Sequence, residues 1–330
     1  MSLHVLHVVG GLPDFGKPQC QPFVASQIRS LPHAGVEVDV FDLAQLGNGW
    51  RKYMLGMPGV RSRLLHGHFD LVHAHYGYCG WVSRFQRRVP VVVSLMGSDL
   101  LGDVDERGDL TLRSRFDGWA SQVLASLVEH VIVKSPAMLH KLRWAKHVTV
   151  LPNGVDFALF RPMDRGAARR ALGIELKQRV VLFAADPHNP RKNYALAQAA
   201  VERLQSRIGS ATLLPFFAQE QSRFALAANA ADVLVMTSFI EGSPNVVKEA
   251  MACNLPVVSV DVGDVPEVIC GTKHCHLADC NAEDIAANLA TVLDAGERSD
   301  GRERIQHLRL ELVAQNLVRV YSEVLERCNA

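Results

Sequence analysis

Two glutamates eight residues apart, Glu241 and Glu249, lie in a stretch whose residue types suit a phosphorylated, polyhydroxylated ligand. Glu241 follows an apolar run, and the residues expected to open a helix come next: Gly242, Ser243 and Pro244. The free N–H groups and positive dipole end of a helix start suit phosphate or sugar hydroxyls. Glu249 lies just over one turn further on, where a carboxylate can accept hydrogen bonds from a ribose diol. These residues alone fit an ordinary capped amphipathic helix with solvated glutamates equally well.

The elements that must position these glutamates are short valine-rich runs alternating with helical patterns. Because the runs are apolar on both faces, they predict parallel strands buried between helix layers, in two doubly wound α/β sets. The predicted strands are Leu3–Val9, Glu37–Phe41, Leu71–His75, Val89–Leu95, His130–Lys134 and Val148–Leu151, then Arg179–Ala184, Ala211–Phe216, Val233–Met236, Pro256–Val260 and His274–Leu277. The predicted helices include Phe23–Leu31, Leu110–Val128, Arg165–Leu172, Tyr194–Arg207, Asn245–Cys253 and Ala282–Leu293.

The boundary between the two sets is predicted near residue 160, because Pro152, Asn153 and Gly154 are strong turn signals at the end of a strand. This gives two Rossmann-like domains, residues 1–158 and 159–308. Arg302–Arg327 shows a helical period throughout and no strand follows it. We therefore expect a C-terminal helix, about residues 309–330, to pack back on the N-terminal domain. Two such domains bind ligands at the carboxyl ends of their strands, in a cleft that they face.

Composition and charge exclude several classes of protein. The 35 basic and 34 acidic residues give a net charge of +1, which argues against a general nucleic-acid binder. The N-terminal apolar run is too short for a signal peptide or a membrane span, so a cytoplasmic protein is expected. The seven cysteines fit a reducing compartment. Cys270, Cys275 and Cys280 cluster, but their spacing matches no standard zinc knuckle, and we expect no metal there.

The segment from residue 50 to 88 mixes aromatic and cationic side chains. Between Gly47 and Arg88, seven basic residues stand against Asp70 alone, a local net charge of +6. Such a mixture suits an anionic membrane surface, at the inner face of the cell membrane. A solvated face with buried apolar stems is the alternative.

The stretch that begins at Glu241 and continues through EAMACNLPVVSVDVGDVPEVI resembles the signature of the family 4 retaining glycosyltransferases, which have the GT-B fold. Further segments support the resemblance in order: VLPNGVDFALFRP, RKN, ADVLVMTSF before the motif, and the closing LVRVYSEVLER. The resemblance covers essentially the whole chain. Within the family, the chain is most similar to bacterial enzymes of surface-polysaccharide assembly, such as those for teichuronic acid or exopolysaccharide.

The resemblance implies that Glu249 holds the ribose hydroxyls of a nucleotide-sugar donor. Glu241, with the backbone from Gly242 to Asn245, would hold the sugar hydroxyls and the distal phosphate. Lys192, with Arg191, would neutralise the diphosphate, so that neither a metal nor another cofactor is required. UDP is favoured over GDP, and the acceptor is expected to be a glycan or a lipid-linked intermediate.

The remaining implied donor-side positions are Gly263 and Glu267 on the next loop, and Gly11 after the first strand. Retaining members of this kind have no evident enzymic nucleophile, because the donor phosphate is thought to take the acceptor proton. We therefore name no general base, although Asp99 is the nearest candidate for a polar catalytic role.

The chain departs from the family pattern at three places. Many members have His at the position of Met96, and methionine cannot donate that hydrogen bond to the donor sugar. Gln21 and Pro22 stand where a second glycine is common, which places Gln21 on the acceptor side. Pro187 replaces a frequent arginine, for which Arg191 is a substitute.

His73 and His75 lie on one face of a predicted strand and are expected to point toward the mouth of the cleft, on the acceptor side. The main alternative to an active transferase is a catalytically impaired GT-B scaffold subunit, which Met96 keeps open. A nucleotide-sugar epimerase would need an acid/base pair that the sequence does not offer. A nicotinamide dehydrogenase would need a G-x-G-x-x-G after the first strand, which is missing.

Overall fold

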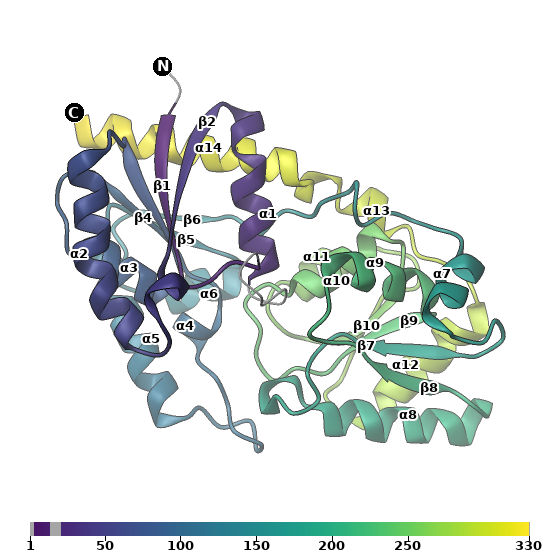
Figure 1. Cartoon of the computed structure of the whole chain (residues 1–330). Helices are drawn as coiled ribbons and strands as arrows, with labels where there is room; N and C mark the ends of the chain where they lie inside the picture. The colour runs from purple at the N-terminus through teal and green to yellow at the C-terminus, as the bar shows by residue number, and fades with distance from the viewer. Residues whose placement is uncertain (1–2, 14–20, 330) are drawn as a thin grey trace. The chain divides into compact units, whose positions relative to one another are not determined.

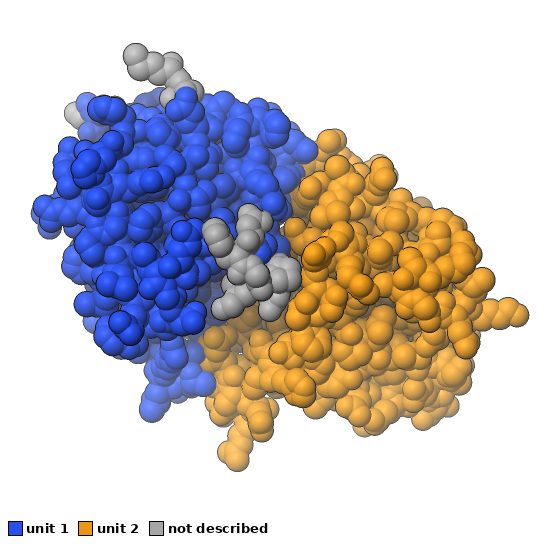
Figure 2. All heavy atoms as spheres, in the orientation of Figure 1, with its two compact units in different colours: residues 1–102, 110–154, 310–330 blue, residues 103–109, 155–309 orange. Residues whose placement is uncertain are grey.

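The computed structural model describes residues 3–13 and 21–329. These residues form two compact units, coloured separately in Figure 2. The first unit contains the described residues up to 102, then 110–154 and those from 310 onward. The second contains 103–109 and 155–309. The short segment 103–109 thus lies with the second unit although the chain on both sides of it belongs to the first.

The described part of the first unit is built on a six-stranded parallel sheet in the order β2-β1-β3-β4-β5-β6 (Figure 1). The strands are β1 (Leu3–Val9), β2 (Val36–Asp42), β3 (Leu71–His75), β4 (Val91–Ser94), β5 (His130–Val133) and β6 (Val148–Val150). Its α-helices are α1 (Pro22–Ser30), α2 (Arg51–His66), α3 (Gly77–Arg84), α4 (Ser98–Leu101), α5 (Leu112–Leu127), α6 (Pro136–Lys141) and α14 (Leu310–Asn329).

Successive side chains of these strands point to opposite faces, so each strand contributes to two cores. Leu6 and Val8 of β1 join the larger core, whereas Val5 joins a core that contains the apolar stripe of α14. That stripe consists of Val313, Leu317, Val320, Tyr321 and Val324, which recur at helical spacing. The expectation that a C-terminal helix packs back on the N-terminal domain is confirmed.

The second unit holds a five-stranded parallel sheet in the order β11-β10-β9-β7-β8. Its strands are β7 (Val180–Phe183), β8 (Thr212–Pro215), β9 (Val233–Met236), β10 (Val257–Val260) and β11 (His276–Ala278). Its α-helices are α7 (Arg165–Leu172), α8 (Tyr194–Ile208), α9 (Gln221–Ala230), α10 (Asn245–Ala252), α11 (Val265–Ile269), α12 (Ala282–Ala295) and α13 (Gly301–Arg304). The two doubly wound parallel sheets predicted from the sequence are confirmed.

The helical predictions need two corrections. The segment Arg302–Arg327 is not one helix, because α13 ends at Arg304, a short 3-10 turn spans Gln306–Leu308, and α14 begins at Leu310. Helix α2 was not predicted, since its helix-breaking Gly56, Pro58 and Gly59 obscure the period. The glycines are used for packing: a Cβ on Gly56 would lie 2.4 Å from the Leu43 side chain.

No helix in the described part of the chain is both long enough and apolar enough to cross a membrane.

Candidate functional site

The residues expected to bind the donor follow three neighbouring strands in the second sheet. Strand β9 lies between β7 and β10, and all three run parallel. Their carboxyl ends therefore meet at the same edge of the sheet, the usual ligand edge of this architecture. The loop after β7 carries Lys192, the loop after β9 carries Glu241, and the loop after β10 carries Gly263.

The first two loops are joined by an ion pair and by backbone contacts. The ammonium of Lys192 donates to Oε1 of Glu241, with side-chain exposures of 18% and 9%. The hydroxyl of Thr237 donates to the carbonyl oxygens of Lys192 and Asn193 at 3.0 Å each. The N–H of Phe239 donates to the carbonyl of Arg191 at 2.9 Å. The two sequence-distant residues Lys192 and Glu241 are thus held together.

Glu241 is set up to remain ionised. Burial alone would raise its pKa, but the charges of Lys192 and Arg191, together with hydrogen bonds from Lys192 and Ser238, outweigh that effect and hold the pKa below its ordinary value. An ionised carboxylate accepts hydrogen bonds and donates none. Glu241 is therefore suited to accept from hydroxyl groups rather than to act as a general acid.

Arg191 is partly engaged by an acidic residue from a distant part of the chain. Its Nη1 donates to Oδ1 of Asp103 at 3.1 Å, and the Asp103 side chain is 61% exposed. The Nε of Arg191 is buried without a hydrogen-bond partner among the described residues. An exposed ion pair of this kind is weak. The guanidinium can consequently exchange Asp103 for a phosphate at low cost.

Glu249 on α10 is buried and poorly compensated. Gln221 of α9 donates to its Oε1 from 3.3 Å. Burial raises the pKa of Glu249 to about 7, and the hydrogen bond from Gln221 opposes this only in part. A carboxylate held this way gains from new donors such as the two hydroxyls of a ribose. Glu249 is therefore able to accept further hydrogen bonds.

The turn between Glu241 and α10 differs in detail from the sequence prediction. The helix begins at Asn245, and Pro244 is its N-cap rather than a residue of the first turn. The neighbouring loop comes very close at Gly263, whose φ is +64°. A Cβ there would lie 2.9 Å from the carbonyl oxygen of Gly242, so only glycine fits without strain. Glu267, on α11, is exposed.

Asp99 in the first unit holds a loop through hydrogen bonds from the backbone. Its carboxylate accepts N–H groups from Met96 and Gly97 at 2.9 Å each and from Gly77 at 3.0 Å. It is 2% exposed, and burial raises its pKa to about 6 despite these backbone hydrogen bonds. Both oxygens of Asp99 thus accept backbone hydrogen bonds that hold its loop, and its catalytic role stays a prediction. Met96 itself is half-buried and packs against Val9 and its neighbours.

Gly11 and Gln21 flank a part of the chain, residues 14–20, that lies outside the described residues. Gly11 is buried with φ +153°, and Gln21 caps α1 in a left-handed conformation with φ +46°. The Oε1 of Gln21 is buried without a partner among the described residues. Lys52 of α2 donates to the carbonyl of Gly10 at 2.6 Å, which ties this loop to α2.

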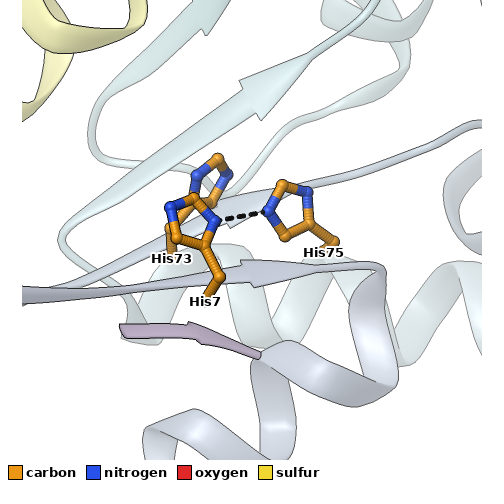
Figure 3. Close-up of side chains that lie close together, drawn as sticks. All are labelled: His7, His73 and His75. Carbon is orange, nitrogen blue, oxygen red and sulfur yellow. Dashed lines mark hydrogen bonds between the residues drawn. The ribbon is translucent and has the colours of Figure 1, made fainter. Parts of the chain in front are cut away.

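His73 and His75 do not point to an open edge, contrary to the prediction. Both are 0% exposed inside β3. They gather with His7 of β1, which lies opposite His73 in the sheet register (Figure 3). Nε2 of His75 and Nδ1 of His7 are 3.0 Å apart. The prediction that this pair contacts an acceptor directly is therefore corrected, because neither side chain reaches the surface.

The His7, His73 and His75 cluster could hold a metal by distance alone, since one ring nitrogen from each lies within 4.8 Å of the others. The surroundings of His73 disfavour a metal ion. Both nitrogens of His73 are already used, by the Tyr321 hydroxyl at 2.6 Å and by Ser94 Oγ at 2.9 Å. Burial, and then neighbouring cationic groups that include Lys134, hold the pKa of His73 far below its ordinary value. These conditions also disfavour a second cation.

The cysteines gathered near β11 form no metal-binding group in the described part of the chain. Cys270 and Cys280 are exposed, and Cys275 is half-buried. Sequence analysis missed Gln221, Asp103 and His7. Their partners lie 28, 88 and 68 residues away, and no local pattern marks such pairs.

Comparisons with known proteins agree with this geometry. Residues 21–159 match the family model described as Glycosyltransferase Family 4, and residues 188–295 match that described as Glycosyl transferases group 1. Both halves of the chain are therefore glycosyltransferase domains.

Among curated proteins, the chain is similar to the D-inositol 3-phosphate glycosyltransferase of Mycobacterium leprae, with 31% identity over 251 residues. That match covers 64% of this chain and 57% of the relative, so this chain spans little more than half of that relative's length. A protein of the same name from Thermobispora bispora is 25% identical over 387 residues, covering 99% of this chain and 90% of the relative.

Two solved structures have the same fold. Sucrose-phosphate synthase from Thermosynechococcus elongatus gives a TM-score of 0.82 at 19% identity and covers 98% of this chain and 100% of that one. Anabaena Alr3699/HepE, in complex with UDP and glucose, gives a TM-score of 0.70 at 17% identity with the same coverage, 98% and 100%. The expected GT-B fold is confirmed.

Proposed function

We propose, from the glycosyltransferase domains that make up both halves of this chain, that it is a retaining glycosyltransferase with a nucleotide-diphosphate sugar as donor. The observation that carries the proposal is the ion pair of Lys192 with Glu241 at one edge of the second sheet, together with the buried Glu249 on α10, the helix that follows Glu241. These residues supply a cation for phosphate, an ionised acceptor for sugar hydroxyls and a desolvated acceptor for a ribose. A nucleotide-diphosphate sugar presents the matching ribose, diphosphate and sugar in that order.

In this proposal, the cationic residues stabilise the leaving nucleotide. Lys192 shifts from Glu241 toward the diphosphate, and Arg191 exchanges the exposed Asp103 for a phosphate oxygen. Charge that develops on the leaving phosphate is then neutralised by groups already in position, which is commonly the largest catalytic contribution. The proposed site uses these two side chains in place of a metal ion.

Glu241 and Glu249 then bind the two ends of the donor. Once Lys192 engages phosphate, the ionised Glu241 accepts from the sugar hydroxyls, and the backbone N–H groups near the start of α10 face the distal phosphate. Glu249 accepts from the ribose hydroxyls, which relieves its uncompensated burial. Gly263 permits the loop after β10 to approach closely the loop that carries Glu241.

The nucleotide and acceptor are narrower proposals. UDP is favoured over GDP, supported by a fold neighbour that was solved with UDP and with UDP-glucose. For the acceptor we propose a glycan or lipid-linked intermediate of polysaccharide assembly. D-inositol 3-phosphate is the second candidate, favoured by a relative of that name that matches across 99% of this chain.

A peripheral membrane contact through α2 belongs to the same proposal. Trp50, Met54 and Leu55 are 72%, 55% and 49% exposed, and Arg51 follows Trp50 as the first residue of α2. Exposed apolar side chains beside cations suit an anionic lipid surface. The test is sedimentation with vesicles of neutral or anionic lipid, comparing the wild type with Trp50→Ser/Leu55→Ser. Equal sedimentation of both proteins would contradict the contact.

The donor assignment is tested by isothermal titration with UDP, GDP and ADP. We expect micromolar binding of one nucleotide, lost in Glu249→Ala and kept in Glu202→Gln, an exposed glutamate of α8. Absence of binding for all three nucleotides would instead favour the scaffold alternative, with Met96 as its leading cause. Retention is tested separately, by the anomeric configuration of the product in NMR spectra; inversion would refute it.

A further inference from the structure

A buried three-residue network lies beside the donor residues but has no part in the roles described so far. It consists of Lys248 on α10, Ser243 in the loop after β9, and Asp264 in the loop after β10. Lys248 is 0% exposed and Asp264 is 4% exposed. Lysine and aspartate are rarely buried to this degree unless they are paired, so the network requires a reason.

The hydrogen bonds of the network run in a closed triangle. The ammonium of Lys248 donates to Asp264 Oδ2 at 2.8 Å and also to the Ser243 hydroxyl. That hydroxyl donates in turn to Asp264 Oδ2 at 2.8 Å. Oδ1 of Asp264 has no partner among the described residues. Each bond joins a different pair of elements, so the triangle fixes the two loops and the helix to one another.

The network acts at the point where the two loops touch. Gly263, adjacent to Asp264, packs against the carbonyl groups of Glu241 and Gly242, and a Cβ there would approach them to 3.1 and 2.9 Å. Packing prevents a closer approach, while the ion pair prevents separation. The N–H groups between Gly242 and Asn245 are thereby held in one orientation.

We propose that Lys248 and Asp264 are positioning residues that hold the phosphate- and sugar-binding turn of the donor site. The inference rests on the proposed function. It predicts that loss of the pair weakens binding of the diphosphate more than binding of the ribose. The proposed ribose-binding residue is Glu249, and none of the three hydrogen bonds of the network involves Glu249.

The test compares the wild type with Lys248→Met/Asp264→Asn, which removes both charges together and leaves no uncompensated buried ion. Ser243→Ala is a milder variant that leaves both charges in place. Arg169→Met/Asp232→Asn is the matched control, because Arg169 of α7 and Asp232, just before β9, form another largely buried ion pair, also 2.8 Å apart.

Hydrogen–deuterium exchange of the unliganded proteins is measured first. We expect the amides of residues 241–243, 245 and 261–264 to exchange at least tenfold faster in the double variant, less so in Ser243→Ala, and at the wild-type rate in the control. Exchange in α8 and α12 should not change. Wild-type exchange of both loops in a folded double variant would overturn the positioning role.

Titrations with UDP and UMP, and with GDP and GMP, supply the second measurement. In the double variant we expect a tenfold or greater loss for the diphosphate and less than threefold for the monophosphate. Equal losses for both would overturn the selectivity. If the wild type binds none of these nucleotides, the proposed donor binding fails, whereas the exchange data still decide whether the network holds the turn.

Discussion

The replacement Glu249→Gln should make the unliganded protein more stable at alkaline pH and at the same time weaken nucleotide binding. Burial raises the pKa of Glu249 from 4.5 to about 7. The folded state therefore holds this proton more tightly than the unfolded state does. The resulting cost to stability is absent well below pH 4.5, grows as pH rises, and is complete above pH 7. Glutamine has the same shape but never ionises, so it escapes this cost.

The magnitude follows from the shift. A difference of about 2.5 pKa units at about 1.36 kcal/mol per unit gives a gain of about 3 kcal/mol at pH 8.5. The same linkage leaves a gain of only about 1 kcal/mol at pH 5. Nucleotide affinity should fall, because an amide replaces the carboxylate proposed to accept from the ribose. Hydrogen bonds to charged groups contribute about 1.5–3 kcal/mol, or roughly 10- to 100-fold in affinity.

The assay is urea unfolding of wild type and variant at pH 5, 6, 7 and 8.5, followed by titration with the nucleotide that the wild type prefers. Glu202→Gln is the control for removing a glutamate charge from an exposed helix face. Wild-type affinity should also rise as pH increases through about 7. A stability difference that does not change with pH would refute the raised pKa, and undiminished binding by a folded variant would refute the ribose contact.

Three further changes have defined outcomes. Lys192→Met should weaken diphosphate binding by roughly 10- to 100-fold, since it removes a charged hydrogen bond. It should also raise the pKa of Glu241 by removing its nearest cation. Titration calorimetry across pH measures both effects, and unchanged affinity would count against the diphosphate role. Gly263→Ala should cost about 1–3 kcal/mol of unfolding free energy, because the residue has φ +64° and its Cβ would meet a backbone oxygen at 2.9 Å. Urea unfolding measures the cost, and a variant with the same unfolding midpoint as the wild type would contradict it. Tyr321→Phe should cost about 1–3 kcal/mol of unfolding free energy, because it leaves the buried Nδ1 of His73 without its partner at 2.6 Å. Thermal melts measure the loss, and an unchanged melting temperature would count against this hydrogen bond.

The local pattern of the chain was enough to predict most of the fold. Strands β1, β3 and β9 have the predicted bounds, and the others differ from prediction only at their ends. This succeeded because strands buried on both faces of a parallel sheet are continuous apolar runs bounded by turn residues. The positions of Lys192 and Glu241 after strands were predictable for the same reason, because adjacent parallel strands end at one edge of the sheet. Their part in donor binding stays a proposal.

Helix α2 and the interrupted C-terminal helix were not predictable in this way. Gly56 and Pro58 disfavour a helix locally, but tertiary packing against Leu43 outweighs that preference. The break before α14 falls where Val155 pairs with Arg309 and where Leu308 accepts from the Val155 N–H at 2.8 Å. Those contacts bring together positions more than 150 residues apart, and periodicity carries no information about them.

What the sequence determined by itself is the residue types and their order along the chain: Lys192 and Glu241 each follow a strand, and Glu249 lies on the helix that comes after Glu241. What only the tertiary structure decided is which side chains those residues meet. His73 had the expected strand and face, yet its nitrogens are used by Tyr321 and Ser94 in the interior. The physical reason is that hydrogen-bond partners and desolvation depend on distances between elements, and these are established only when the sheets and helices pack.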